Sequence, residues 1–154
     1  MLERNKKDKR MTISLGSDHA GFSLKEAIRG FLDQKGLPYV DHTPNLIPGD
    51  DYPLIAHKVA KHVVAHPDHQ GILICGSGIG MDIAANRVKG VRAATVRSVK
   101  EAKLSRQDDD ANILVLGGRI TSPALAKRII TSWLKTSTST AKRHKRRIQE
   151  LDQL

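Results

Sequence analysis

Short apolar runs alternate along the chain with segments in which apolar residues recur every three or four positions. The runs predict five β-strands, at residues 12–16, 38–42, 71–75, 92–96 and 112–116. The other segments predict helices at residues 23–34, 51–63, 80–89, 99–105, 122–134 and about 140–152. Such an alternation is typical of an α/β domain. We therefore expect a single-domain, three-layer α/β/α sandwich with a five-stranded parallel, Rossmann-like sheet and a basic C-terminal helix.

The ends of the predicted strands carry the glycine-rich and polar segments of the chain. Ligands of open parallel sheets bind in the crevice beyond the carboxyl ends of the strands. The segments 17–21, 75–80 and 106–112 are all expected at this edge, where their side chains would converge. This convergence predicts a ligand-binding site.

The composition is typical of a globular protein and argues against a membrane or a secreted one. The chain has 154 residues, of which 39% are hydrophobic and 27% are charged, a balance typical of one globular domain with a single core. No apolar stretch approaches the roughly 20 residues of a membrane span, and the charged N-terminus lacks the apolar segment of a secretory signal. A single cysteine forms no intrachain disulfide. We therefore expect a cytoplasmic protein without membrane contact.

The formal net charge of +10 is concentrated at the two ends of the chain. Residues 1–10 hold five basic and two acidic residues, and residues 135–154 hold six basic and two acidic ones, so the ends carry +7. Aromatic residues make up only 3% of the chain, so stacking platforms are scarce and nucleic-acid binding is not expected as the main function. We interpret residues 1–11 as a flexible basic extension and residues 12–154 as the domain.

The segment 71–87, GILICGSGIGMDIAANR, combines the chain's only cysteine with a glycine-rich turn. Backbone amides at such a turn can bind a phosphate, but no Lys-Ser/Thr follows the glycines as in a nucleotide-binding loop. Cys75 is either a small buried residue or a reactive thiol, because amides and a helix N-terminus beside it favour the thiolate. A thiolate could remove a proton from carbon while the amides hold the oxyanion, and Ser77 could relay a hydroxyl proton.

Acidic and histidine side chains elsewhere leave alternatives open. Asp18 and His19 either cap the first helix or bind a sugar hydroxyl or a phosphate. His62 and His66 share a helical face, but no carboxylate or cysteine completes a metal-binding set. We therefore expect surface histidines and no metal site.

Arginines are the candidate phosphate ligands. Arg143 and Arg147 lie four positions apart, so they share a helical face and could together bind a phosphate, unless that face is simply solvated. Arg119 follows the fifth predicted strand and is a third candidate.

Several segments resemble one known family. They are GSDHAGF at 16–22, DYP at 51–53, GILICGSGIGMDIAANR at 71–87, SRQ at 105–107, NILVLGGR at 112–119 and RHKRRI at 143–148. In this order they resemble ribose-5-phosphate isomerase type B, a family that also contains galactose-6-phosphate isomerase subunits. The resemblance implies interconversion of ribose 5-phosphate and ribulose 5-phosphate through an enediolate, without metal or organic cofactor, in the pentose phosphate pathway.

The resemblance also implies roles for single residues. Cys75 would be the base that moves a proton between carbons 1 and 2, and Ser77 would help to move the hydroxyl proton. Some family members have a glutamate base at the position of Met81, so this chain resembles the cysteine version. The implied substrate contacts are the amides of Gly76, Gly78, Ile79 and Gly80 at the oxyanion, Asp18 and Tyr52 at the sugar, and His19, Arg119, Arg143 and Arg147 at the phosphate.

One segment departs from the family. Members commonly have R-x-H-N at this place, and the histidine helps to open the furanose ring. Here Asp108 stands at the histidine position and Asp109 at that of the asparagine. A carboxylic acid is normally ionised at neutral pH and then donates no proton, although crowded like charges favour its protonated form. Either Asp108 does the work of the histidine, or ring opening is spontaneous, or the substrate is not ribose 5-phosphate.

The resemblance further implies a homodimer, sometimes a tetramer, in which the C-terminal arginines of one subunit complete the active site of its neighbour. Two alternatives to a ribose-5-phosphate isomerase stay open. One is an isomerase of a hexose 6-phosphate such as allose or galactose 6-phosphate. The other is a non-catalytic sugar-phosphate or nucleic-acid binding protein on the same scaffold.

Overall fold

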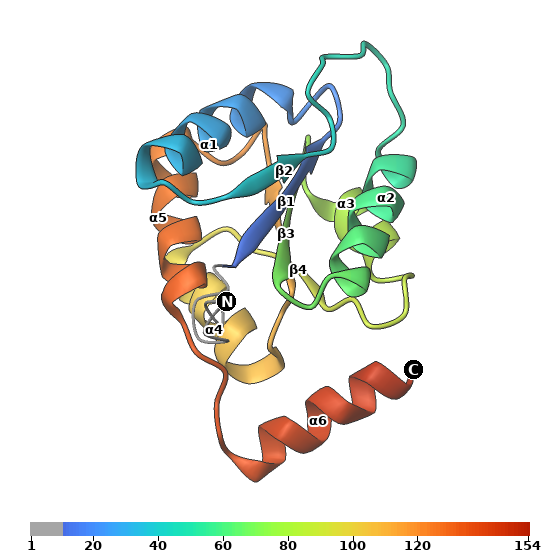
Figure 1. The fold of residues 1–154 in the computed structure, drawn as a ribbon, viewed down its shortest axis with the longest axis vertical. Helices are drawn as coiled ribbons and strands as arrows, with labels where there is room; N and C mark the ends of the chain where they lie inside the picture. The colour runs from blue at the N-terminus through green and yellow to red at the C-terminus, as the bar shows by residue number, and fades with distance from the viewer. Residues whose placement is uncertain (1–10) are drawn as a thin grey trace, which may run out of the picture.

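The computed structural model describes residues 11–154, so the predicted extension lies outside the described residues except for Met11. One sheet contains β1 (Thr12–Ser17), β2 (Tyr39–Asp41), β3 (His69–Cys75), β4 (Ala93–Thr95) and β5 (Ile113–Gly117). The helices are α1 (Phe22–Lys35), α2 (Tyr52–Ala65), α3 (Ile79–Ala85), α4 (Val99–Asp109), α5 (Pro123–Lys135) and α6 (Lys142–Gln153). The predicted α/β/α sandwich with a C-terminal helix is confirmed (Figure 1).

The order of the strands determines where a ligand would bind. All pairs are parallel, in the order β2-β1-β3-β5-β4. β1 and β3 lie side by side, from Thr12 opposite His69 to Ser17 opposite Ile74. The chain leaves β1 towards one side of the sheet and leaves β3 towards the other. The carboxyl ends of β1 and β3 therefore form the switch point at which open sheets bind ligands.

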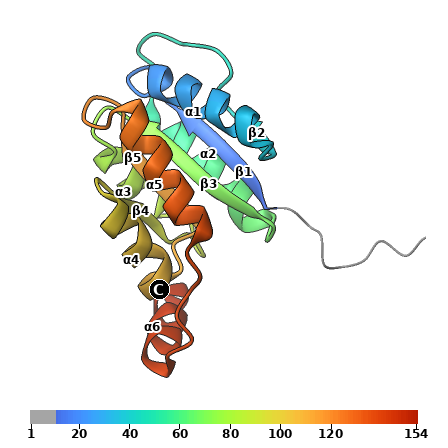
Figure 2. The ribbon, with the colours of Figure 1, turned by 90° about the vertical axis from the view of Figure 1, so that its left-hand side faces the viewer.

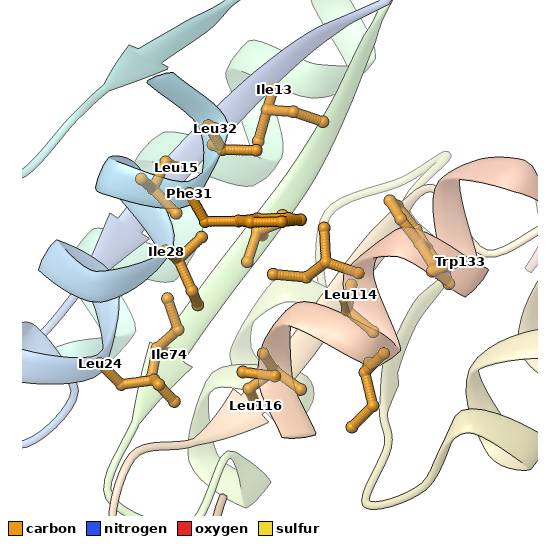
Figure 3. Close-up of a cluster of buried hydrophobic side chains, with 14 of the residues drawn as sticks. Ile13, Leu15, Leu24, Ile28, Phe31, Leu32, Ile74, Leu114, Leu116 and Trp133 are labelled. Atoms are coloured by element: carbon orange, nitrogen blue, oxygen red, sulfur yellow. The ribbon is translucent and has the colours of Figure 1, made fainter. Parts of the chain in front are cut away.

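Helices cover both faces of the sheet, with α1, α4 and α5 on one face and α2 and α3 on the other (Figure 2). β3 is apolar from Ile72 to Cys75 because alternate side chains enter the two cores, Ile72 and Ile74 on one face and Leu73 and Cys75 on the other. Figure 3 shows the larger core, which includes Trp133 of α5.

The predicted end of α4 is wrong. Ser98 caps the helix as its side chain accepts the Glu101 N–H at 3.1 Å. The helix does not end at residue 105 but continues to Asp109, and Asp110 follows in the left-handed region with φ 47°. Residues 106–112 contain no glycine and no apolar periodicity, so they carry no visible helix end.

α6 lies apart from the two helical layers, below the sheet in Figure 1 and packed against α4. Its side chains are mostly exposed, and His144 is its buried residue. Within residues 11–154, no helix is both long and apolar enough to cross a bilayer.

Candidate active site

Cys75 ends β3 directly beside the end of β1. The Asp18 N–H donates to the Ile74 carbonyl at 3.3 Å, which brings the residue after β1 level with the cysteine. Cys75 is only 4% exposed, yet the Gly78 N–H donates to its Sγ at 3.2 Å. The thiol is thus packed in the core and also bonded to an amide of the turn, a position that suits a reactive thiol as well as a structural one.

The turn after Cys75 depends on glycine. Gly78 has a φ of 85°, where side chains other than glycine are strained, and α3 begins at the next residue. The Ile79 N–H donates to Ser77 Oγ at 3.2 Å. Ser77 is exposed, so the hydroxyl two residues after the thiol is accessible to a ligand.

Arg119 and Tyr52 both lie over glycines of this turn. The Arg119 N–H donates to the Gly76 carbonyl at 3.0 Å, and a Cβ on Gly76 would lie 2.9 Å from the Arg119 guanidinium. A Cβ on Gly80 would lie 2.5 Å from the Tyr52 ring. A larger residue at either glycine would therefore displace a side chain that is predicted to bind the substrate.

Asp18 and His19 extend this site from β1. Asp18 is 5% exposed, and its Oδ1 accepts the Gly21 N–H at 3.0 Å. The His19 N–H donates to Asp50 Oδ1 at 2.7 Å, and the same oxygen lies 3.0 Å from the ring Nδ1. His19 is thus oriented by the loop 42–51 and does not cap α1, whose N-cap is Gly21.

The segment 106–112 lies at the opposite edge of the sheet, so its predicted place at the carboxyl edge is wrong. A helix between parallel strands returns the chain to the amino ends, and α4 continues to Asp109. Arg92 lies just before β4, and its Nε donates to the carbonyls of Asp109 and Asp110 at 3.1 Å each. Asp108 and Asp109 are therefore remote from Cys75 of the same chain.

Arg143 and Arg147 also lie at the amino edge, because α6 is attached there at both ends. Near its start, His144 Nδ1 lies 3.2 Å from the Asp108 carbonyl and 3.7 Å from its carboxylate. Near its end, Asp152 forms an ion pair with Arg92. One chain thus places its predicted base and half of its predicted phosphate ligands at opposite edges of the sheet.

Four histidines form a cluster beside α2. The His62 ring stacks on His66 with centroids 4.1 Å apart, and it contacts His42 at 4.7 Å and His69 at 4.9 Å. Burial is the main cause that lowers the pKa of His42 to about 4, and burial also lowers the pKa of His62. His62 is thus half-buried and not the surface histidine that the sequence suggested, whereas His66 is exposed as expected. No group of three or more potential ligands within residues 11–154 is arranged to hold a metal ion.

Sequence reasoning missed three residues behind the site. Asp50 orients His19, and Thr43 accepts the N–H of Ser17, the last residue of β1, at 2.9 Å. Lys25 is fully buried and holds the start of the same loop. Lys25 falls on the stripe of α1 that Ile28 continues, and a lysine in an apolar stripe was the available signal.

The chain is similar in sequence and in structure to known sugar-phosphate isomerases. Residues 13–151 match the family described as Ribose/Galactose Isomerase. The ribose-5-phosphate isomerase B of Mycolicibacterium paratuberculosis is 42% identical over 142 residues, which are 92% of this chain and 89% of that protein. The D-erythrulose-4-phosphate isomerase of Pectobacterium atrosepticum is 41% identical over 127 residues, 80% of this chain and 82% of that protein. The structure of Mycoplasma genitalium ribose-5-phosphate isomerase B with bound ribulose-5-phosphate has a TM-score of 0.87 and 42% identity, covering 92% of this chain and 94% of that one.

Proposed function

We propose that this chain, which belongs to the ribose/galactose isomerase family and is a sugar-phosphate isomerase, interconverts ribose 5-phosphate and ribulose 5-phosphate with Cys75 as the base. One observation carries the proposal: a buried thiol at the switch point of the sheet accepts the Gly78 N–H at 3.2 Å. A place in the pentose phosphate pathway and a cytoplasmic location stay predictions.

The reaction would begin on the open-chain aldose. The Cys75 thiolate takes the proton from carbon 2, and the electron pair forms the carbon 1–carbon 2 double bond of an enediolate with its charge on oxygen 1. Amides of residues 76–80 would stabilise this oxyanion, and the exposed Ser77 hydroxyl would move a proton from oxygen 2 to oxygen 1. The Cys75 thiol then returns its proton to carbon 1, which leaves the ketose and restores the thiolate.

Residues around the thiol suit the remainder of the substrate. Asp18 and Tyr52 would bind sugar hydroxyls, since one flanks Cys75 and the other lies over Gly80. Arg119, over Gly76, and His19, oriented by Asp50, would bind the phosphate by charge-assisted hydrogen bonds.

Arg143, Arg147, Asp108 and Asp109 would join this site only from a second copy of the chain. An apolar surface beside the site supports such an assembly: Leu54 is 72% exposed, Ile83 54% and Ile79 52%. Their burial against another copy would be favourable. We therefore propose a homodimer with two shared sites, and a tetramer stays a prediction.

The decisive experiment incubates the protein with ribose 5-phosphate in heavy water with a chelator, and follows the carbon 1 and carbon 2 protons by NMR. We expect ketose to form, and Cys75→Ala to lower turnover by about 10³-fold or more. Ketose formation that persists undiminished in Cys75→Ala would overturn the cysteine base. An inactive wild-type protein would overturn the proposed substrate and direct attention to hexose phosphates or to a binding role.

A second candidate substrate follows from Asp108. A tetrose 4-phosphate cannot close a furanose ring, because its oxygen 4 carries the phosphate, so it needs no ring-opening acid. The relative from Pectobacterium atrosepticum is named for such a substrate. If this chain prefers a tetrose phosphate, its kcat/KM will be higher for erythrose 4-phosphate than for ribose 5-phosphate. Asp108→His would then raise turnover of the ribose phosphate alone.

A further inference from the structure

Lys25 of α1 is a charged residue without solvent contact, since its side chain is 0% exposed. An ammonium group is strongly disfavoured in such a place unless each of its three protons has an acceptor. Three oxygens meet that need: Asp41 Oδ2 at 2.7 Å, the Thr43 carbonyl at 2.8 Å and Glu26 Oε1 at 2.9 Å. The Phe22 ring lies 4.5 Å from the same nitrogen.

Asp41 is the last residue of β2, and Thr43 belongs to the loop that leaves β2 and arches above the sheet in Figure 1. Asp41 holds the loop a second time, because its Oδ1 accepts the Thr43 N–H at 3.0 Å. Lys25 and Asp41 together therefore fix both backbone polar groups of Thr43.

Thr43 passes this constraint to the candidate active site. Its Oγ1 accepts the Ser17 N–H at 2.9 Å, and Ser17 directly precedes Asp18 and His19. Further along the same loop, Asp50 holds His19 through both its amide and its ring. The loop thus holds residues 17–19 at two points, and the buried lysine anchors the first of them. A further bond, from the His42 N–H to the Leu15 carbonyl at 2.9 Å, lies further back in β1.

We propose that Lys25 and Thr43 are positioning residues that hold the end of β1 in the conformation required to bind substrate, an inference that rests on the proposed function. Neither residue contacts the reacting atoms. Cys75 is held independently, because the Gly118 N–H donates to its carbonyl at 2.7 Å and the Gly78 N–H to its sulfur. Loss of the Lys25–Thr43 connection therefore affects substrate binding more than the chemical step.

Thr43 offers a matched pair of substitutions. Thr43→Val keeps the shape but removes the acceptor of the Ser17 N–H, and Thr43→Ser keeps the hydroxyl. We expect Thr43→Val to raise KM for ribose 5-phosphate about tenfold with kcat changed less than about twofold, and Thr43→Ser to stay within about twofold in both. Amide hydrogen exchange at Ser17 is expected to accelerate in Thr43→Val alone.

Lysine itself is tested by Lys25→Met, which keeps much of the side-chain length, with Lys35→Met as the control. Lys35 lies exposed on the same helix, so the control removes the same charge without touching the loop. We expect a rise in KM for Lys25→Met at least as large as for Thr43→Val, and none for Lys35→Met. Lys25→Met leaves Asp41 without its cation. If this variant does not fold, the Thr43 variants alone test the proposal.

An unchanged KM in Thr43→Val, or an equal rise in Thr43→Ser, would overturn the proposal. Its failure differs from failure of the proposed function. In the first case the wild-type protein turns over sugar phosphate and the Thr43 variants do not differ. In the second the wild-type protein is inactive, while hydrogen exchange at Ser17 still shows whether Thr43 holds the strand end.

Discussion

The two edges of the sheet are built in different ways. At the carboxyl edge, glycines bring backbone segments into close contact, and a Cβ on Gly21 would lie 2.4 Å from the Ile74 carbonyl. At the amino edge, charged side chains join α4, β4 and α6: Arg92, just before β4, pairs with Asp110 at the end of α4 and with Asp152 of α6.

This difference separates two tasks. Close backbone contacts hold a thiol and its surrounding amides with little freedom, which suits proton transfer at carbon. Ion pairs between side chains hold α6 while its arginines stay exposed, which suits the capture of an anion. A single chain keeps these tasks apart, so the comparison itself predicts a second copy.

The largest expected effect comes from mixing two inactive variants, which tests whether two copies of the chain share a site. If each site combines Cys75 of one chain with Arg147 of the other, a heterodimer of Cys75→Ala and Arg147→Ala contains one intact site. Random co-refolding would then recover about one quarter of wild-type activity from two nearly inactive proteins. Mixing Cys75→Ala with Asp18→Ala, which alter the same edge, is expected to recover none. An inactive first mixture would contradict the shared site.

Backbone contact at the carboxyl edge is tested by two glycine-to-alanine changes in one region. Gly21→Ala places a methyl group against the Ile74 carbonyl and is expected to lower the free energy of unfolding by about 2–3 kcal/mol. Gly30→Ala, within α1, meets no atom within 4 Å and is expected to raise it by about 0.5–1 kcal/mol. Urea unfolding measures both. Equal effects of the two changes would argue against a crowded edge.

The histidine cluster, which lies between the two edges of the sheet, is expected to make the stability of the fold sensitive to acid. Burial lowers the pKa of His42 to about 4 in the folded protein, so between pH 6.5 and 4 the unfolded chain binds the extra proton. The free energy of unfolding is therefore expected to fall as pH drops through this range, and His42→Gln should flatten the dependence. The exposed His57→Gln serves as the control in urea unfolding at pH 7 and pH 4.5. If His42→Gln leaves the pH dependence of the free energy of unfolding unchanged, other groups cause the acid sensitivity.

The smallest expected effect concerns the amino edge. Asp152→Asn removes the ion pair that attaches the end of α6 to Arg92 and is expected to raise KM about two- to fivefold at low salt, with kcat unchanged. Glu150→Gln removes the same charge from the same helix, where its partner is the exposed Arg146, and should change neither value. Steady-state kinetics at two salt concentrations distinguishes them. Identical kinetics in both variants would show that this attachment has no role in binding.

Much of the fold and half of the site were predictable because their signals are local. Alternation of apolar runs and helical periodicity indicates parallel strands, and the position of Cys75 at the end of such a run places it at the carboxyl edge. Asp108 was misplaced because its position depends on where α4 ends, and that end lies in a polar stretch without a stop signal. Lys25 was missed because a buried lysine is recognised by its three acceptors, of which only Glu26 lies on its own helix.

The class of fold, the thiol with its glycine turn and the basic C-terminal segment could be recognised in the sequence, since each depends on neighbours along the chain. Which segments share an edge of the sheet became clear only in three dimensions. Parallel strands bring residues distant in sequence together at one edge, and intervening helices carry others to the opposite edge. For this reason Asp18 lies beside Cys75, Thr43 holds Ser17, and Arg147 lies where it could act only on a second copy of the chain.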